Sequence, residues 1–252
     1  MKRAVELFLE YFDVLQAESE TLRNCAYRIR YQVYCEEFRF ENRNQFPDAM
    51  ERDEYDDQSD HCLFIHRPSN QAAGCSRLIH IDPANGLSLP FLRYCKESIN
   101  YQLFNPDDYA FNEIVEFSRL SVTRQFRRRC SDQGMFYTKP VSSQSLNKKR
   151  HPFPIVPVSL FLASISLFLE SGAAVGVAMM ETRLSRMLHI YGLRFEQVGP
   201  VVDYHGKRAP FILRRENATC WMTKEVLELF YCIQERMRES RQQEDALSLV
   251  GS

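Results

Sequence analysis

The spacing of hydrophobic positions changes several times along this chain, between the 3.6-residue repeat of a helix and the two-residue repeat of a strand. Helical spacing predicts helices at residues 20–37, 89–97, 158–171, 182–191 and 219–243. Alternating or short continuous apolar runs predict strands at residues 61–66, 73–81, 114–122, 174–180, 195–198, 201–204 and 210–213. Residues 2–18 fit one amphipathic helix or a short helix followed by a strand at 11–15, and we favour the second. Helices interleaved with strands predict one α/β (α+β) domain over residues 1–252 with a mixed sheet, since no linker interrupts the pattern.

The strand predicted at 114–122 is unusual because it carries a carboxylate, a hydroxyl and a guanidinium in four residues. Strict alternation predicts two faces, with Glu116, Ser118 and Leu120 on one and Phe117, Arg119 and Ser121 on the other. Such groups are costly to bury without partners. The chain offers partners in Arg30, Asp53, Asp56 and Arg77.

Residues 38–60 predict a long ordered loop, with an acidic run at 51–57. A solvated loop face is the default for such a run, and a site for a hard cation is the sharper alternative. The spacing is not that of an EF-hand and no histidine pair lies nearby, so we predict no metal.

Arg30 and Arg77 lie in segments patterned for burial, where they either pair with carboxylates for architectural reasons or belong to a functional site. Gly74 inside a strand predicts a bulge or a close backbone approach.

Composition and charge narrow the function classes. With 44% hydrophobic and 26% charged residues the chain is globular, and its net charge of −1 gives no overall field that selects nucleic acid or membrane. Eight cysteines without a CxxC pair indicate reduced thiols. The most apolar run, 155–169, contains Pro157 and is too short to span a bilayer, and the N-terminus does not resemble a secretory signal. We therefore expect a soluble, cytoplasmic protein without stable membrane insertion.

Residues 124–154 differ in composition from the rest and predict a mobile basic insertion within the fold. Its basic residues are Arg124, Arg127, Arg128, Lys148, Lys149 and Arg150. A solvated loop is the default, and docking of an acidic phosphopantetheine carrier is the alternative. Nucleic-acid binding is disfavoured because no recognition motif accompanies the basic residues.

The polar residues belong to one ordered series: Arg30-x3-Tyr34, Phe40, Glu51-x-Asp53-x2-Asp56, Gly74-x2-Arg77-Leu78, Phe91 and Glu116-x-Ser118-Arg119. This series resembles the signature of acyl-homoserine lactone synthases. Tyr34 and Phe40 stand where that family usually has Phe and Trp, extra residues precede Glu116, and the second half of the chain matches poorly. Residues 28–37, Arg-Ile-Arg-Tyr-Gln-Val-Tyr-Cys-Glu-Glu, more closely resemble the acyltransferases associated with PEP-CTERM/exosortase systems, which are relatives of those synthases.

The resemblance implies the fold of the Gcn5-related N-acyltransferases (GNAT), a twisted mixed sheet whose central strands splay apart to admit an acyl thioester. It implies that an amino-acid-like amine attacks a fatty acyl thioester of acyl carrier protein or coenzyme A, with no permanently bound cofactor. Arg30, Arg77 and Arg119 would order the acidic loop over this amine and bind its carboxylate by a bidentate fork. Glu116 would accept the proton of the ammonium, with Ser118 and Arg119 as further catalytic residues. The residues implied to bind the small amine substrate are Arg30, Tyr34, Phe40, Glu51, Asp53, Asp56, Arg77 and Phe91. No nucleophilic triad is visible around Ser118, so direct attack by the amine is the favoured route.

Several alternatives stay open at this point. The absence of a glycine-rich pyrophosphate loop favours a carrier protein over coenzyme A as donor. The apolar helix at 158–169 is either ordinary core or, together with Val175, Val177, Met179 and Met180, the lining of an acyl-chain tunnel. The competing functions are an acyl-homoserine lactone synthase that uses S-adenosylmethionine and a noncatalytic acyl-binding or regulatory module.

Overall fold

One mixed sheet of eight strands organises the part of the chain that the computed structural model describes, residues 3–81, 88–127, 137–138 and 153–250. Its strands are β1 (Phe12–Gln16), β2 (Ser59–His66), β3 (Gln71–His80), β4 (Ile114–Val122), β7 (Val175–Met180), β8 (Glu196–Gln197), β9 (Val202–Asp203) and β10 (Lys207–Arg214). They lie in the order β1-β2-β3-β4-β7-β10-β8, and β9 also pairs with β10. All neighbours are antiparallel except β4 and β7, which are parallel. A separate pair is formed by β5 (Tyr137–Thr138) and β6 (Phe153–Pro154).

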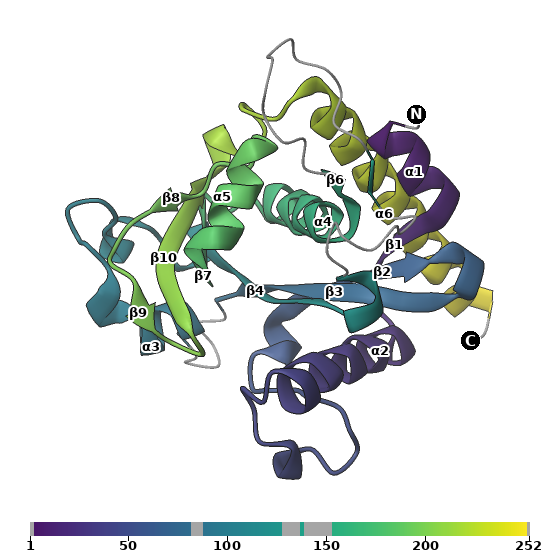
Figure 1. The fold of residues 1–252 in the computed structure, drawn as a ribbon, viewed down its shortest axis with the longest axis horizontal. Coiled ribbons are helices and arrows are strands. Elements are labelled where there is room, and N and C mark those ends of the chain that lie inside the picture. Colours follow the sequence, from purple (N-terminus) through teal and green to yellow (C-terminus); the bar gives the residue numbers. More distant parts are fainter. Residues whose placement is uncertain (1–2, 82–87, 128–136, 139–152, 251–252) are drawn as a thin grey trace.

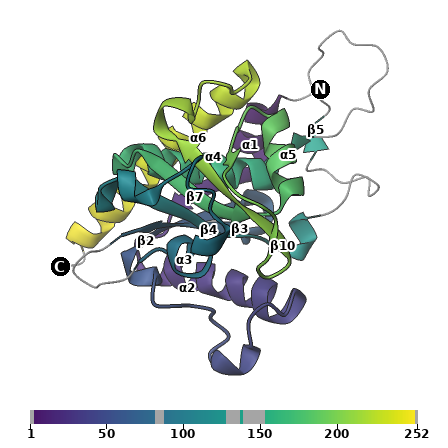
Figure 2. The same cartoon turned by 90° about the vertical axis from the view of Figure 1, so that its left-hand side faces the viewer.

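Helices cover both faces of this sheet (Figures 1 and 2). They are α1 (Ala4–Tyr11), α2 (Glu20–Arg30), α3 (Pro90–Tyr94), α4 (Ile155–Ser171), α5 (Thr182–Ile190) and α6 (Lys224–Val250). Helix α2 lies on one face, whereas α4 lies on the other, with α6 beside it over β1 and α1 packed against α6 (Figure 1). Residues 158–168 of α4 are buried throughout, which explains why the segment is apolar on all sides. Among the described residues, no helix is long and apolar enough to cross a bilayer.

The predicted elements are largely confirmed, including the short helix and strand at the N-terminus. Four helices differ from their predicted bounds by more than one residue: α3 ends at Tyr94 rather than at residue 97, α4 begins at Ile155 rather than at residue 158, and the other two are α2 and α6. The helix expected over 20–37 is α-helical only to Arg30 and continues as a π-helix over Tyr31–Glu37, where the Phe38 N–H bonds to the Val33 carbonyl. The last helix begins at Lys224 rather than at residue 219. The predicted insertion at 124–154 falls mostly outside the described residues.

The two faces predicted for β4 are wrong after Ser118, because the strand contains a bulge. Arg77 of β3 pairs with Ser118, whereas Cys75 pairs with Ser121, so β4 has one residue more than its neighbour. Arg119 occupies this bulge with a φ of 50°. Its side chain reaches the loop carboxylates on the α2 side, and Leu120 packs against the core on the α4 side.

Strands β4 and β7 pair only briefly. Their register contains three residue pairs and ends at Glu116 opposite Val177, although β4 continues to Val122 and β7 to Met180. The backbone edges that face each other beyond these pairs are separated. The splayed central strands implied by the resemblance are therefore confirmed.

At Gly74, strand β3 lies very close to the backbone of β4 and to helix α4. A Cβ at this position would lie 2.5 Å from the Ser121 carbonyl oxygen and 2.8 Å from Leu160 Cδ1. We expect Gly74→Ala to lower the free energy of unfolding by about 1–3 kcal/mol, because backbone and core must move apart. Urea denaturation measures the change, with exposed Gln71→Ala on the same strand as control, expected within about 0.5 kcal/mol of the parent. Equal stabilities for the two variants would contradict the tight packing.

Candidate active site

A cavity of about 350 Å³ occupies the space where β4 and β7 separate. Strand β4 lines it with residues 116–120, and β7 and the residue after it line it with Ala178, Met179, Met180 and Glu181. The remaining walls include Val33, Tyr34, Phe38 and Phe40 beside α2, Phe161 and Ser164 of α4, and Tyr204 and Arg208 of the β9–β10 hairpin. The cavity thus has an apolar side, built from the core, and a polar side, built from the bulged strand.

Glu116 lies on this cavity and is 5% exposed. Its Oε2 accepts a hydrogen bond of 2.8 Å from the backbone N–H of Phe91. Burial raises the pKa of the Glu116 carboxyl to about 7, against the smaller opposing effects of that hydrogen bond and of Arg77 and Arg119. A carboxyl with this pKa changes its protonation state near neutral pH, which suits a general base.

Next to Glu116 lies a set of buried or partly buried opposite charges, which we call the ion-pair cluster. Its members are Arg30, Arg77, Arg119, Glu51, Asp53 and Asp56. The three arginines come from α2, β3 and β4, and the three carboxylates come from the loop that precedes β2. The cluster therefore connects four separate parts of the chain.

The hydrogen bonds of the cluster occupy most of its charged atoms. Arg30 binds Asp56 through two nitrogens, at 2.5 and 3.0 Å, and also contacts Glu51. Arg77 binds Asp53 in the same forked way, at 2.6 and 3.1 Å. Arg119 donates to Glu51 at 3.0 and 3.1 Å. The three guanidinium groups are thus matched by three carboxylates inside the protein, and Glu41 at the edge of the cluster adds a 3.5 Å contact to Arg119.

The cluster keeps its carboxylates ionised. Burial alone would raise the pKa of Asp56, but Arg77 and Arg30 hold that pKa well below its usual range. The pKa values of Glu51 and Asp53 are also lowered, because their arginine partners outweigh burial. His61 lies beneath them with its Nε2 3.6 Å from Asp56 Oδ1. Burial lowers the pKa of His61 to about 4, so its ring is neutral; the sequence pattern had not singled out this residue.

The predicted site residues divide into two groups. Glu116, Ser118, Arg119, Tyr34 and Phe40 line the cavity. The other predicted substrate-binding residues lie outside its lining: Arg30, Glu51, Asp53, Asp56 and Arg77 form the cluster behind it, and the Phe91 side chain is buried in an apolar core. The contribution of Phe91 is its N–H bond to Glu116.

Two further residues of the cavity wall, Tyr204 and Arg208, belong to no sequence motif. They flank the turn of a hairpin whose short strands carry no motif, so only the tertiary structure brings them to Glu116. Burial raises the pKa of Tyr204 to about 12, and its phenol is therefore a neutral hydrogen-bonding group.

The apolar residues considered for a tunnel also divide. Phe161 of α4 and Met179 and Met180 of β7 line the cavity. Val175 and Val177, like most of α4, belong to the closed core.

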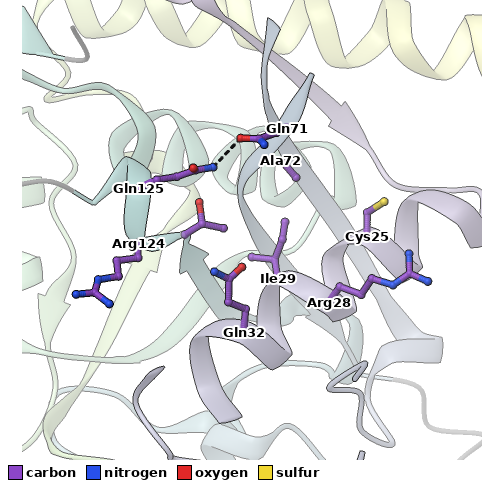
Figure 3. A pocket seen from close by; sticks show the side chains of 9 residues that line it. Cys25, Arg28, Ile29, Gln32, Gln71, Ala72, Arg124 and Gln125 are labelled. Carbon is purple, nitrogen blue, oxygen red and sulfur yellow. Dashed lines mark hydrogen bonds between the residues drawn. The ribbon is translucent and has the colours of Figure 1, made fainter. Parts of the chain in front are cut away.

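Arg124, predicted to dock the acyl donor, lines a separate open groove of about 1070 Å³ between α2 and the end of β4. Arg28 and Arg124 lie on opposite sides of this groove, and Gln125 donates a 3.0 Å hydrogen bond to Gln71 (Figure 3). Arg127 forms an ion pair with Glu37, and its guanidinium carbon lies 4.7 Å from the centre of the Phe38 ring. The remaining predicted docking residues, Arg128, Lys148, Lys149 and Arg150, lie outside the described residues.

Comparison with known proteins agrees with this architecture. Residues 29–136 match the acetyltransferase (GNAT) domain family. The CoA-dependent acyl-homoserine lactone synthase BjaI, solved with SAM and isopentyl-CoA, superposes with a TM-score of 0.57 at 18% identity, covering 89% of each chain. The fold is that of the Gcn5-related N-acyltransferases.

Two further solved structures share this GNAT fold. The AHL synthase LasI has a TM-score of 0.55 at 16% identity, covering 84% of this chain and 93% of LasI. FeeM, an N-acyl amino acid synthase from uncultured soil microbes, has a TM-score of 0.55 at 11% identity, covering 84% and 94%. No curated protein matches this chain in sequence.

Removing one arginine from the ion-pair cluster tests how much the complete cluster contributes to the free energy of unfolding. Arg77→Met leaves Asp53 and Asp56 short of a buried partner, so we expect a loss of about 3–5 kcal/mol in the free energy of unfolding at pH 7. The control is Arg93→Met, which breaks an exposed pair with Glu54 and should cost at most about 1 kcal/mol. Urea denaturation measures both, and similar small costs would show that the cluster is not a buried, interdependent unit.

The raised pKa of Glu116 also makes the free energy of unfolding depend on pH. Its pKa in the folded chain exceeds the ordinary value of 4.5, so the folded state binds the proton more tightly, and wild-type stability falls as pH rises from about 4.5 to 7. We expect Glu116→Gln to stabilise the protein by up to about 3 kcal/mol at pH 8 and by much less at pH 5. Denaturation at the two pH values measures this difference. Exposed Glu97→Gln is the control, and a gain for Glu116→Gln that does not change with pH would refute the raised pKa.

Proposed function

We propose that this protein is an N-acyltransferase that moves a fatty acyl group from an acyl thioester to an amino-acid-like amine, with Glu116 as general base. The observation that carries this proposal is the position of Glu116, buried on the cavity between β4 and β7 with a pKa near 7. A cavity with an apolar and a polar side suits the two substrates, because the acyl chain needs the first and the amine needs the second.

The proposed reaction begins with proton transfer from the substrate ammonium to Glu116, directly or through one water. The neutral amine attacks the thioester carbonyl, a C–N bond forms and the C–S bond breaks. The thiolate leaves and takes up the proton that the attacking nitrogen loses as it becomes the amide. Backbone N–H groups on the separated edges of β4 and β7 are suited to stabilise the oxyanion. The Ser118 hydroxyl, which accepts a 3.3 Å hydrogen bond from Arg77, adds a polar group beside this position.

Phe117, Leu120, Phe161, Met179 and Met180 supply the apolar side of the cavity, where we place the acyl chain. Methionine is suited to this role because its flexible thioether adapts to chains of different length. A donor on coenzyme A is supported by the likeness to BjaI, solved with isopentyl-CoA. Acyl carrier protein as donor and partner, the basic docking residues, an exosortase association and a cytoplasmic location stay predictions.

A second candidate is an acyl-homoserine lactone synthase. It is favoured by the order of Arg30, Asp53, Asp56, Arg77 and Arg119 and by the likeness to BjaI, whose structure contains SAM. The two candidates differ in product, a lactone against an open-chain N-acyl amine, and mass spectrometry of the product separates them.

The base assignment predicts a pH profile. With a series of acyl-CoA and acyl carrier protein thioesters and an amino acid mixture as acceptor, we expect kcat to rise with pH and level off above about 7, because only ionised Glu116 accepts the proton. Glu116→Gln should lower kcat by about 10²–10⁴-fold and remove the rising limb. Glu97→Gln on the surface should leave both unchanged. A Glu116→Gln enzyme that keeps the profile and rate would exclude Glu116 as the base.

A further inference from the structure

The charges around the cavity are unevenly matched. Arg119 lines the cavity, but its guanidinium already bonds to Glu51 and Asp53. Arg30 and Arg77 lie behind the lining and are likewise held by carboxylates. None of these arginines is available to bind a substrate anion without breaking the ion-pair cluster. The structure therefore disfavours the expectation that they bind the carboxylate of the amine by a fork.

Arg208 is different. It lies on β10 opposite Val202, follows the hairpin turn, and lines the same cavity as Glu116. Its guanidinium carbon is 5.7 Å from the centre of the Phe40 ring, and it forms no ion pair with any described residue. Its Nε is buried and has no hydrogen-bond partner in the described part of the chain. The Nε of Arg77 is also unpartnered, but both terminal nitrogens of Arg77 bond to Asp53, whereas Arg208 bonds to no carboxylate of the described residues. A buried guanidinium N–H without an acceptor is unfavourable unless a ligand supplies one.

We propose that Arg208, and not an arginine of the ion-pair cluster, binds the carboxylate of the amine substrate and so selects acceptors that carry a free carboxylate. This inference rests on the proposed function and names the residue that recognises the acceptor at the same site. Arg208 and Glu116 share one cavity, which matches a substrate that carries its carboxylate close to the attacking nitrogen. A planar guanidinium that contacts an aromatic ring and offers its N–H groups to the cavity is well suited to a carboxylate.

An anion could also come from the acyl donor, whose phosphate is at the far end of the pantetheine arm. The position of Arg208 favours the acceptor, because Arg208 lies on the reaction cavity itself and not along a passage leading to it. Glu181, the other charged lining residue outside the cluster and Glu116, is exposed and of the wrong sign for either anion.

The test compares ligands that differ only in this charge: N-acylglycines of eight to sixteen carbons, and the corresponding N-acylglycinamides. Calorimetry should show wild-type protein binding the acid about tenfold to a hundredfold more tightly than the amide, the range expected for a hydrogen-bonded charge pair. Arg208→Gln should abolish this preference, and Arg208→Lys should keep part of it. Lys207→Gln, one residue away on the same strand and exposed, removes the same charge and should preserve it. Thermal melts establish that each variant is folded.

Wild-type protein that binds neither ligand, or binds both equally, would overturn the inference, as would an acid preference that survives in Arg208→Gln. 4′-Phosphopantetheine is the competing probe: if its affinity falls in Arg208→Gln while the acid preference remains, the anion belongs to the donor. Acid preference without acyl transfer to any amino acid would instead refute the proposed function and leave the carboxylate site standing. The two failures are therefore distinguishable.

Discussion

The site depends on a buried electrostatic constraint: three guanidinium groups and three carboxylates that must all be present at once. Burying a charge without a partner is costly, whereas a complete set of forked ion pairs offsets much of that cost. Because the carboxylates Glu51, Asp53 and Asp56 come from the loop before β2, satisfying Arg30, Arg77 and Arg119 orders that loop against the sheet. Apolar residues of similar size could be as stabilising, so the cluster is better understood as fixing geometry than as adding stability.

The bulge in β4 joins this constraint to the cavity. An unbulged strand would place Arg119 on the α4 side, away from the loop carboxylates, and Leu120 on the polar side. The extra residue instead leaves Arg119 beside Ser118 and returns Leu120 to the apolar side, at the cost of a positive φ for a non-glycine residue. The same stretch of β4 has lost its pairing with β7. One local irregularity thus gives the cavity a polar and an apolar side.

Much of the fold was readable from local sequence, because the helices and strands carry strong periodicity. The strand at 114–122 and the buried helix at 158–171 lie where apolar patterning placed them, with α4 beginning three residues earlier. The motif series also gathered Arg30, Asp53, Asp56 and Arg77 correctly around the central strand. The local pattern could not predict on which face of the sheet or helix each polar side chain lies. The bulge at Arg119 and the π-helix at 31–37 break the period on which such predictions rest, and Arg208 reaches the cavity through a hairpin whose register depends on tertiary pairing.

The raised pKa of Glu116 follows first from its burial, which outweighs the groups around it. The Phe91 N–H, Arg77 and Arg119 each favour the carboxylate form of Glu116, and Asp53, which bonds to both arginines, opposes them with a smaller effect. An uncompensated arginine in the same place would hold the Glu116 pKa lower and make it a weaker base. The ion-pair cluster therefore serves the chemistry by being nearly neutral: it organises the loop and the strand while leaving Glu116 with the proton affinity of a buried carboxyl. Arg208, on the opposite wall, has no such compensating carboxylate among the described residues, which is why it can attract an anion that the cluster cannot.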